Sequence, residues 1–139
     1  MAAMTSAIDV GTELGPLRLT LSSAEVKRYA IVARMPGGRF MGDEEAQREG
    51  LPGQIVPGNF SLSLFARLIH HALPDFTLQH LSGTFRGLVR PSVPLVLHGV
   101  VTERHVTGDG ERLDCDLILE SAEGDRLVTG TAKLQLASP

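Results

Sequence analysis

The chain has 139 residues, 42% of them apolar, and its 13 basic and 16 acidic side chains give a formal net charge of −3. This size and composition predict a single domain over residues 1–139 with a real core, and the lack of a lysine- or arginine-rich block argues against a nucleic-acid partner. With one cysteine, Cys115, no zinc-site spacing, no secretory leader and no apolar run of membrane-spanning length, we expect a cytoplasmic protein with no metal, no cofactor and no membrane segment.

The first elements are short. Residues 1–14 show no clear periodicity and are expected to form a flexible arm, and residues 17–20 favour a short strand. A capping box of the S-x-x-E form predicts an amphipathic helix over residues 22–33. The Pro-Gly-Gly sequence at residues 36–38 breaks that helix and opens a loop. Asp43 is then placed to cap a second short helix that runs to residue 49.

A long, largely apolar helix is expected over residues 57–72, launched from a Pro-Gly turn. Ser63, Arg67, His70 and His71 gather on one side, so the helix should be buried on all but that stripe. The rest of the chain alternates as strands do, with good turn sequences between the later segments. These segments predict a four-stranded antiparallel meander over residues 76–86, 95–106, 112–121 and 125–136.

The amino end of the central helix is the main candidate site. Unpaired N–H groups and a partial positive charge at a helix start suit a carbonyl oxygen that gains negative charge. We therefore assign Gly58 and Asn59 as candidate catalytic groups. The alternative interpretation is an ordinary helix start after a tight turn.

Four motifs in order carry a family resemblance. They are the helix over residues 22–33, the Asp-Glu-Glu-Ala sequence at 43–46, the Ile-Val-Pro-Gly sequence at 55–58, and the Phe-Arg-Gly-Leu-Val-Arg-Pro sequence at 85–91. Over residues 17–136 the chain resembles the MaoC-like branch of the hotdog superfamily. The resemblance implies an α+β fold, with one hotdog domain in which an antiparallel sheet wraps around a long central helix.

The resemblance also implies a substrate class and an assembly. It predicts acyl thioesters of coenzyme A or acyl carrier protein as ligands, and a homodimer or higher homo-oligomer, with a heteromeric hotdog partner as an alternative. The best-known activity of the family is reversible hydration of an enoyl thioester. A hydrogen-bond donor at the helix start fits this chemistry, since it would hold the thioester oxygen.

The catalytic motif of the family is missing. Hydrating members carry Asp-x-Asn-Pro-x-His-x-Asp before the second helix, where the first Asp and the His act as general acid and base. Residues 36–43 here read Pro-Gly-Gly-Arg-Phe-Met-Gly-Asp. One alignment puts the catalytic pair on Pro36 and Met41, and the other puts it on Met35 and Phe40. The loop histidine and helix carboxylate of the related fatty-acid dehydratases are also absent, since the matching helix position is near Ser63.

The remaining site candidates come from the loop and the strand ends. Asp43 is a candidate substitute base, with a helix cap as the alternative. Arg39 and Arg86 are candidates for the phosphates of a carrier, with exposed arginines paired to nearby acids as the alternative. Further candidates for substrate binding are Phe40, Met41 and Pro57.

Three functions are compatible with these features. The first, taken as the family default, is a hydratase or dehydratase of acyl thioesters with a non-standard active site. The second is a noncatalytic thioester-binding subunit of a heteromeric hotdog complex. The third is a cyclase or isomerase in polyketide assembly, whose pocket mainly orients a reactive chain.

Overall fold

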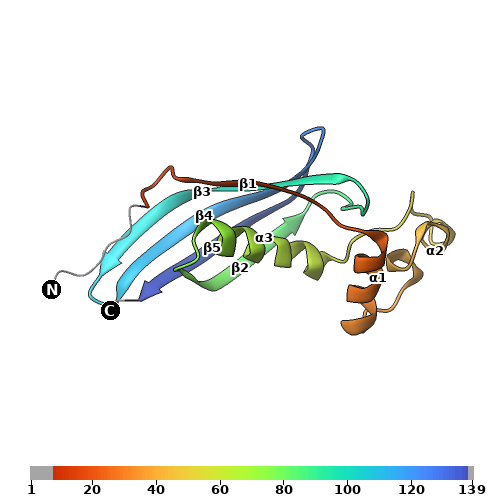
Figure 1. The fold of residues 1–139 in the computed structure, drawn as a ribbon, viewed down its shortest axis with the longest axis horizontal. Helices are drawn as coiled ribbons and strands as arrows, with labels where there is room; N and C mark the ends of the chain where they lie inside the picture. Colours follow the sequence, from red (N-terminus) through yellow and green to blue (C-terminus); the bar gives the residue numbers. More distant parts are fainter. Residues whose placement is uncertain (1–7, 138–139) are drawn as a thin grey trace.

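A computed structural model describes residues 8–137, which form a five-stranded antiparallel sheet, three α-helices and one short 3₁₀ helix (Figure 1). The fold is of the expected α+β class. The elements in chain order are β1 (Glu13–Thr20), α1 (Ser23–Val32), η1 (Gly38–Phe40), α2 (Asp43–Arg48), α3 (Gly58–Ala72), β2 (Thr77–Phe85), β3 (Pro94–Thr107), β4 (Gly110–Ser121) and β5 (Arg126–Ala137).

The strand order is β1-β3-β4-β5-β2, which corrects the expected four-stranded meander. Strands β3, β4 and β5 do follow one another as hairpins, but β2 pairs with β5 at the far edge of the sheet and not with β3. The link over residues 86–93 contains a turn at Pro91 and Ser92, but it carries the chain across the end of the sheet and does not fold β3 back onto β2. Its Arg86 and Gly87 N–H groups bond the Leu127 carbonyl, and its Ser92 N–H bonds the Leu21 carbonyl.

The first strand begins earlier than expected. Glu13 and Leu14, assigned above to a flexible arm, are the first residues of β1, and Leu14 is buried. The register of β1 against β3 shifts between Leu14 and Leu17, where Gly15 has a φ of +80°. This bulge puts two inward leucines three residues apart, so the alternation that identifies a strand is lost. Residues 1–7 of the predicted arm lie outside the described residues.

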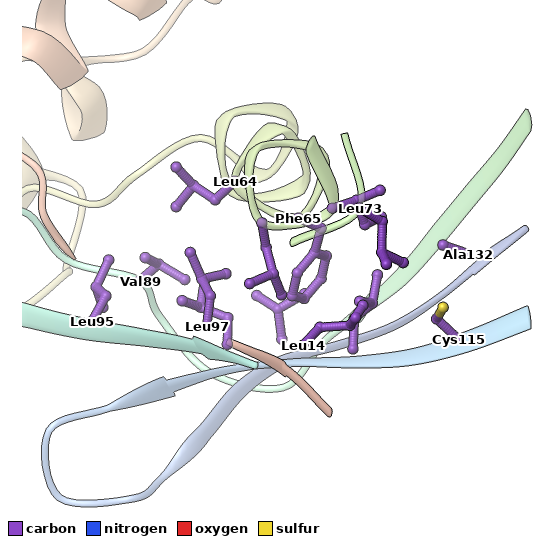
Figure 2. Packing of buried hydrophobic residues seen from close by; sticks show 14 of the residues in the cluster. Leu14, Leu64, Phe65, Leu73, Val89, Leu95, Leu97, Cys115 and Ala132 are labelled. Carbon is purple, nitrogen blue, oxygen red and sulfur yellow. The ribbon is translucent and has the colours of Figure 1, made fainter. Parts of the chain in front are cut away.

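Helix α3 lies along one face of the curved sheet and supplies much of the core (Figure 1). Phe65 and Leu68 are fully buried, and Figure 2 shows Phe65 pointing from the helix toward the strands. The exposed stripe of Ser63, Arg67 and the two adjacent histidines is confirmed. The sheet contributes alternate inward side chains from three strands, among them Leu97, Val101, Leu113, Cys115, Leu117, Leu119, Val128, Ala132 and Leu134.

Cys115 belongs to this core and is 1% exposed. Burial, with smaller contributions from the neighbouring Asp114 and Asp116 charges, raises the pKa of its thiol to about 11. The thiol therefore stays protonated near neutral pH, which argues against a cysteine nucleophile. None of the helices in the described part of the chain is both long and apolar enough to cross a membrane.

Helices α1 and α2 and the η1 turn lie beyond the end of the sheet, next to the start of α3 (Figure 1). The predicted capping box begins α1, where the Ser22 hydroxyl accepts the Glu25 N–H at 3.0 Å. Tyr29 of α1 packs on Phe60 of α3 with their ring centroids 4.5 Å apart. This contact joins the first helix to the opening turn of the central one.

Candidate functional site

The start of α3 is a helix end whose first backbone N–H groups have no side-chain cap. Pro57 is the N-cap residue, with extended backbone angles, and no side chain caps the helix. The first hydrogen bond of the helix runs from the Ser61 N–H to the Pro57 carbonyl at 3.1 Å. Because the N–H groups of a first helical turn have no partner within the helix, those of Gly58 and Asn59 are suited to an external acceptor.

An aromatic ring lies against this helix start. A Cβ built on Gly58 would come within 2.9 Å of Cζ of Phe85, the last residue of β2, so the ring approaches as closely as a glycine allows. Phe85 is 52% exposed. In the sequence Phe85 stands out only as part of a family motif, because no local pattern shows that the end of β2 meets the start of α3.

The loop before α2 is fastened by Gln54, a buried polar residue that is 2% exposed. Its side-chain amide donates to the Phe40 carbonyl at 2.9 Å and to the Ser23 carbonyl at 3.2 Å, and its Oε1 accepts the Ser23 hydroxyl at 2.5 Å. Its backbone N–H donates to Asp43 Oδ1 at 2.8 Å. The Gln54 side chain thus ties α1 to η1, and its backbone N–H ties the same segment to α2.

We expect Gln54→Ala to lower the free energy of unfolding by about 1–3 kcal/mol, since it removes the side-chain donor of the buried Phe40 carbonyl. Gln47→Ala is the matched control, because Gln47 is exposed and makes a single 3.3 Å bond to the Pro52 carbonyl. Its cost should stay within about 0.5 kcal/mol. Urea unfolding of the two variants measures the difference, and equal costs would rule out the fastening role.

Asp43 does not cap α2. The N-cap residue is Gly42, and Asp43 is the first residue of the helix. Its carboxylate turns instead toward the Gln54 N–H, and its Oδ1 lies 3.8 Å from Nη2 of Arg90. The prediction that Asp43 caps α2 is therefore wrong, because its carboxylate accepts a hydrogen bond from the Gln54 N–H, in the segment before α3. The Asp43 side chain is 67% exposed and both contacts are with protein groups, so its position is that of an anchor and not of a buried base.

The three loop candidates lie next to one another but are engaged with the protein. Arg39 forms a two-nitrogen ion pair with Glu49 Oε1, at 2.9 Å from Nη2 and 3.1 Å from Nε. Phe40 is buried at 9% exposure, and Met41 is half-buried. Arg39 thus takes the alternative role, an exposed arginine paired with an acid.

Arg86 lies apart from the other candidates. Its Nε donates to Thr129 Oγ1 at 3.2 Å, beside a hollow on the face of the sheet away from α3. The two neighbours of Thr129 in β5 face α3, because Val128 is buried and a Cβ on Gly130 would meet the Phe65 ring at 3.0 Å. Since successive residues of a strand face opposite sides, Thr129 faces away from α3. Arg86 thus follows the residue whose ring lies against Gly58, but its side chain is bonded on the opposite face of the sheet and does not reach the start of α3.

No histidine reaches the start of α3. His70 lies about 18 Å along the helix from Gly58 at about 1.5 Å per residue, and His71 follows it. His80 precedes Phe85 by about 16 Å of strand. His98 bonds Glu120 at 2.7 Å on the outer face, and His105 is near the far end of β3. The absence of an imidazole from this site, predicted from residues 36–43, thus holds for the described residues.

Comparisons with known proteins establish the fold. No family model and no curated protein matches the chain. Among solved structures, the (R)-hydratase from A. caviae involved in PHA biosynthesis superposes with a TM-score of 0.83 at 22% identity, covering 95% of this chain and 99% of that one. The structural neighbours are MaoC-like dehydratases and hotdog-fold hydratases, which supports the resemblance described above.

Two further neighbours are complexes from Mycobacterium tuberculosis. The ChsH1-ChsH2 complex matches with a TM-score of 0.79 at 18% identity, covering 92% of this chain and 98% of that one. The C-terminally truncated HadBC complex, a 3R-hydroxyacyl-ACP dehydratase, matches with a TM-score of 0.75 at 12% identity, covering 90% and 95%. The predicted single hotdog architecture is confirmed at the level of the fold.

Proposed function

We propose that this hotdog chain is the thioester-binding subunit of a two-chain hydratase or dehydratase, and that a partner chain supplies the general acid and base. One observation carries the proposal. The start of α3 offers free N–H donors, yet the described residues place no histidine there, and Asp43 is held by Gln54 and Arg90. The site is equipped to hold an acyl thioester and lacks the groups to move protons.

The division of labour follows from the chemistry of hydration. The N–H groups of Gly58 and Asn59 donate hydrogen bonds to the thioester oxygen and stabilise the negative charge that develops on it as water attacks. The water oxygen bonds to the β-carbon, and a proton is delivered to the α-carbon. A base must take one proton of this water, whose other proton stays on the new hydroxyl, and an acid must protonate the α-carbon. Both roles fall to the partner chain.

The exposed edge of the sheet suits such a partner. Strand β2 ends the sheet and pairs only with β5 among the described strands, so the backbone groups on its other side are available. Phe85 and Leu88, at or just after the end of this strand, are exposed at 52% and 44%. We place the partner interface along β2. A homodimer through the same edge is the alternative, and a cytoplasmic location stays a prediction.

The test is an activity assay of two chains. Neighbouring reading frames are searched for a hotdog chain with the intact Asp/His motif. This chain is then mixed with that partner, and hydration of a crotonyl thioester is followed. We expect the mixture to be active, an Asp→Asn change in the partner's motif to abolish turnover, and Asp43→Asn here to leave it unchanged. Turnover by this chain alone that Asp43→Asn abolishes would establish a solitary enzyme instead. Thioester binding without hydration in the mixture would favour the cyclase or isomerase interpretation.

A further inference from the structure

Three side chains with metal-ligand chemistry converge on the face of the sheet away from α3. One ligand atom from each of Glu103, His105 and Asp114 lies within 4.8 Å of the others. Glu103 and His105 are two residues apart on β3, so their side chains share a face. Asp114 is the direct cross-strand partner of Glu103 on β4. The group is remote from Gly58, and the proposed thioester chemistry does not use it.

A β-bulge creates this juxtaposition. Val101 pairs with Cys115, and both are buried against α3. The register then shifts, so that Thr102 is the extra residue and Glu103 comes opposite Asp114. Without the extra residue, Glu103 would pair with Leu113 and face the core. Bulges re-aim side chains at functional positions, and the Thr102 hydroxyl fixes this one by donating to the Asp114 carbonyl at 3.1 Å.

The two carboxylates of this group carry negative charge that a bound cation would neutralise. Two carboxylates directly opposite each other destabilise a strand pair. Asp114 Oδ1 is also buried and has no hydrogen-bond partner among the described residues, which is uncommon for a carboxylate oxygen. Arg112 and Lys133 are neighbours by register, but neither forms an ion pair with the group in the described part of the chain.

We propose that Glu103, His105 and Asp114 bind a divalent first-row transition metal, with Zn²⁺ as the best match. One imidazole and two carboxylates are ligands that zinc accepts. Atoms that share a tetrahedral ion at about 2.1 Å lie about 3.4 Å apart. His105 Nε2 and Glu103 Oε2, at 3.1 Å, are already close to that separation. The Asp114 carboxylate would therefore have to move toward these two atoms when the ion binds. The ion joins β3 to β4 near their hairpin and leaves a fourth position to water.

The test is a titration of the purified full chain with Zn²⁺, in which bound zinc is measured by calorimetry and thermal unfolding is followed in parallel. We expect one equivalent to bind and raise the melting temperature. Glu103→Gln and His105→Ala should each weaken binding by at least the 10- to 100-fold that loss of an outer-shell partner costs. Both side chains are at least half exposed, so these variants should fold.

The competing explanation is surface binding at the adjacent His70 and His71 on α3. The double variant His70→Ala/His71→Ala is the matched control, and it should keep the full zinc effect. Binding that survives Glu103→Gln and His105→Ala but is lost in the control would place the metal on α3 and overturn the assignment. An absence of stoichiometric binding to the unmodified chain would overturn it as well.

Discussion

Replacing Phe65 with alanine is expected to lower the free energy of unfolding by about 3–5 kcal/mol. The ring is 0% exposed and packs where α3 crosses the sheet (Figure 2). It fits against Gly130, since a Cβ on that glycine would come within 3.0 Å of Phe65 Cε2. Truncation therefore removes the apolar contacts of the ring and leaves a cavity between helix and strand. Urea unfolding followed by far-UV circular dichroism measures the loss.

Phe85→Ala is the matched control for this stability experiment. It removes the same side chain from a site that is 52% exposed, so its cost should be below about 1 kcal/mol if the chain is studied without a partner. A cost for Phe65→Ala no greater than that of Phe85→Ala would show that α3 is not the centre of the core.

Gly58→Pro is expected to weaken thioester binding about three- to tenfold and to slow turnover by the two-chain assembly about 10²- to 10³-fold. Proline removes the N–H that we assign to the thioester oxygen. It suits the first position of a helix, and the extended Pro57 backbone is what a following proline requires, so α3 should still form. Calorimetric titration with crotonyl-coenzyme A measures the affinity, and crotonyl hydration measures the turnover.

The Phe85 ring complicates a single substitution, because any Cβ at position 58 would meet it at 2.9 Å. Both changes are therefore made in a Phe85→Ala background. Gly58→Ala in that background keeps the N–H and should retain binding, whereas Gly58→Pro in the same background should bind about three- to tenfold more weakly. If the two double variants bind equally well, the N–H of residue 58 does not contact the ligand.

Local patterns in the sequence predicted much of the fold. The apolar period of α3, its polar stripe and the turn residues between β3, β4 and β5 are all local signals, and the structure follows them. The place of β2 was missed because strand order depends on which edge is free and on how the link over residues 86–93 runs. The start of β1 was missed because the bulge at Gly15 interrupts the alternation.

In the candidate site, too, the features set by local sequence were predicted and those set by tertiary contacts were not. The N–H groups at Gly58 follow from a local helix start, and the lack of an Asp/His pair follows from the loop sequence itself. Gln54 gave no signal, because an isolated glutamine between a glycine and an isoleucine does not reveal a buried polar anchor. The expectation of no metal rested on sequence spacing, whereas Glu103, His105 and Asp114 meet only through the register of two strands.

We expect this chain to hold an acyl thioester at the start of α3 but to be unable to hydrate it alone. The most direct test is titration of the purified chain with crotonyl-coenzyme A and with crotonyl acyl carrier protein, followed by analysis of the recovered ligand. We predict saturable binding of at least one of them, with the enoyl double bond intact. Recovery of the 3-hydroxyacyl product, or no saturable binding of either ligand, would contradict the claim.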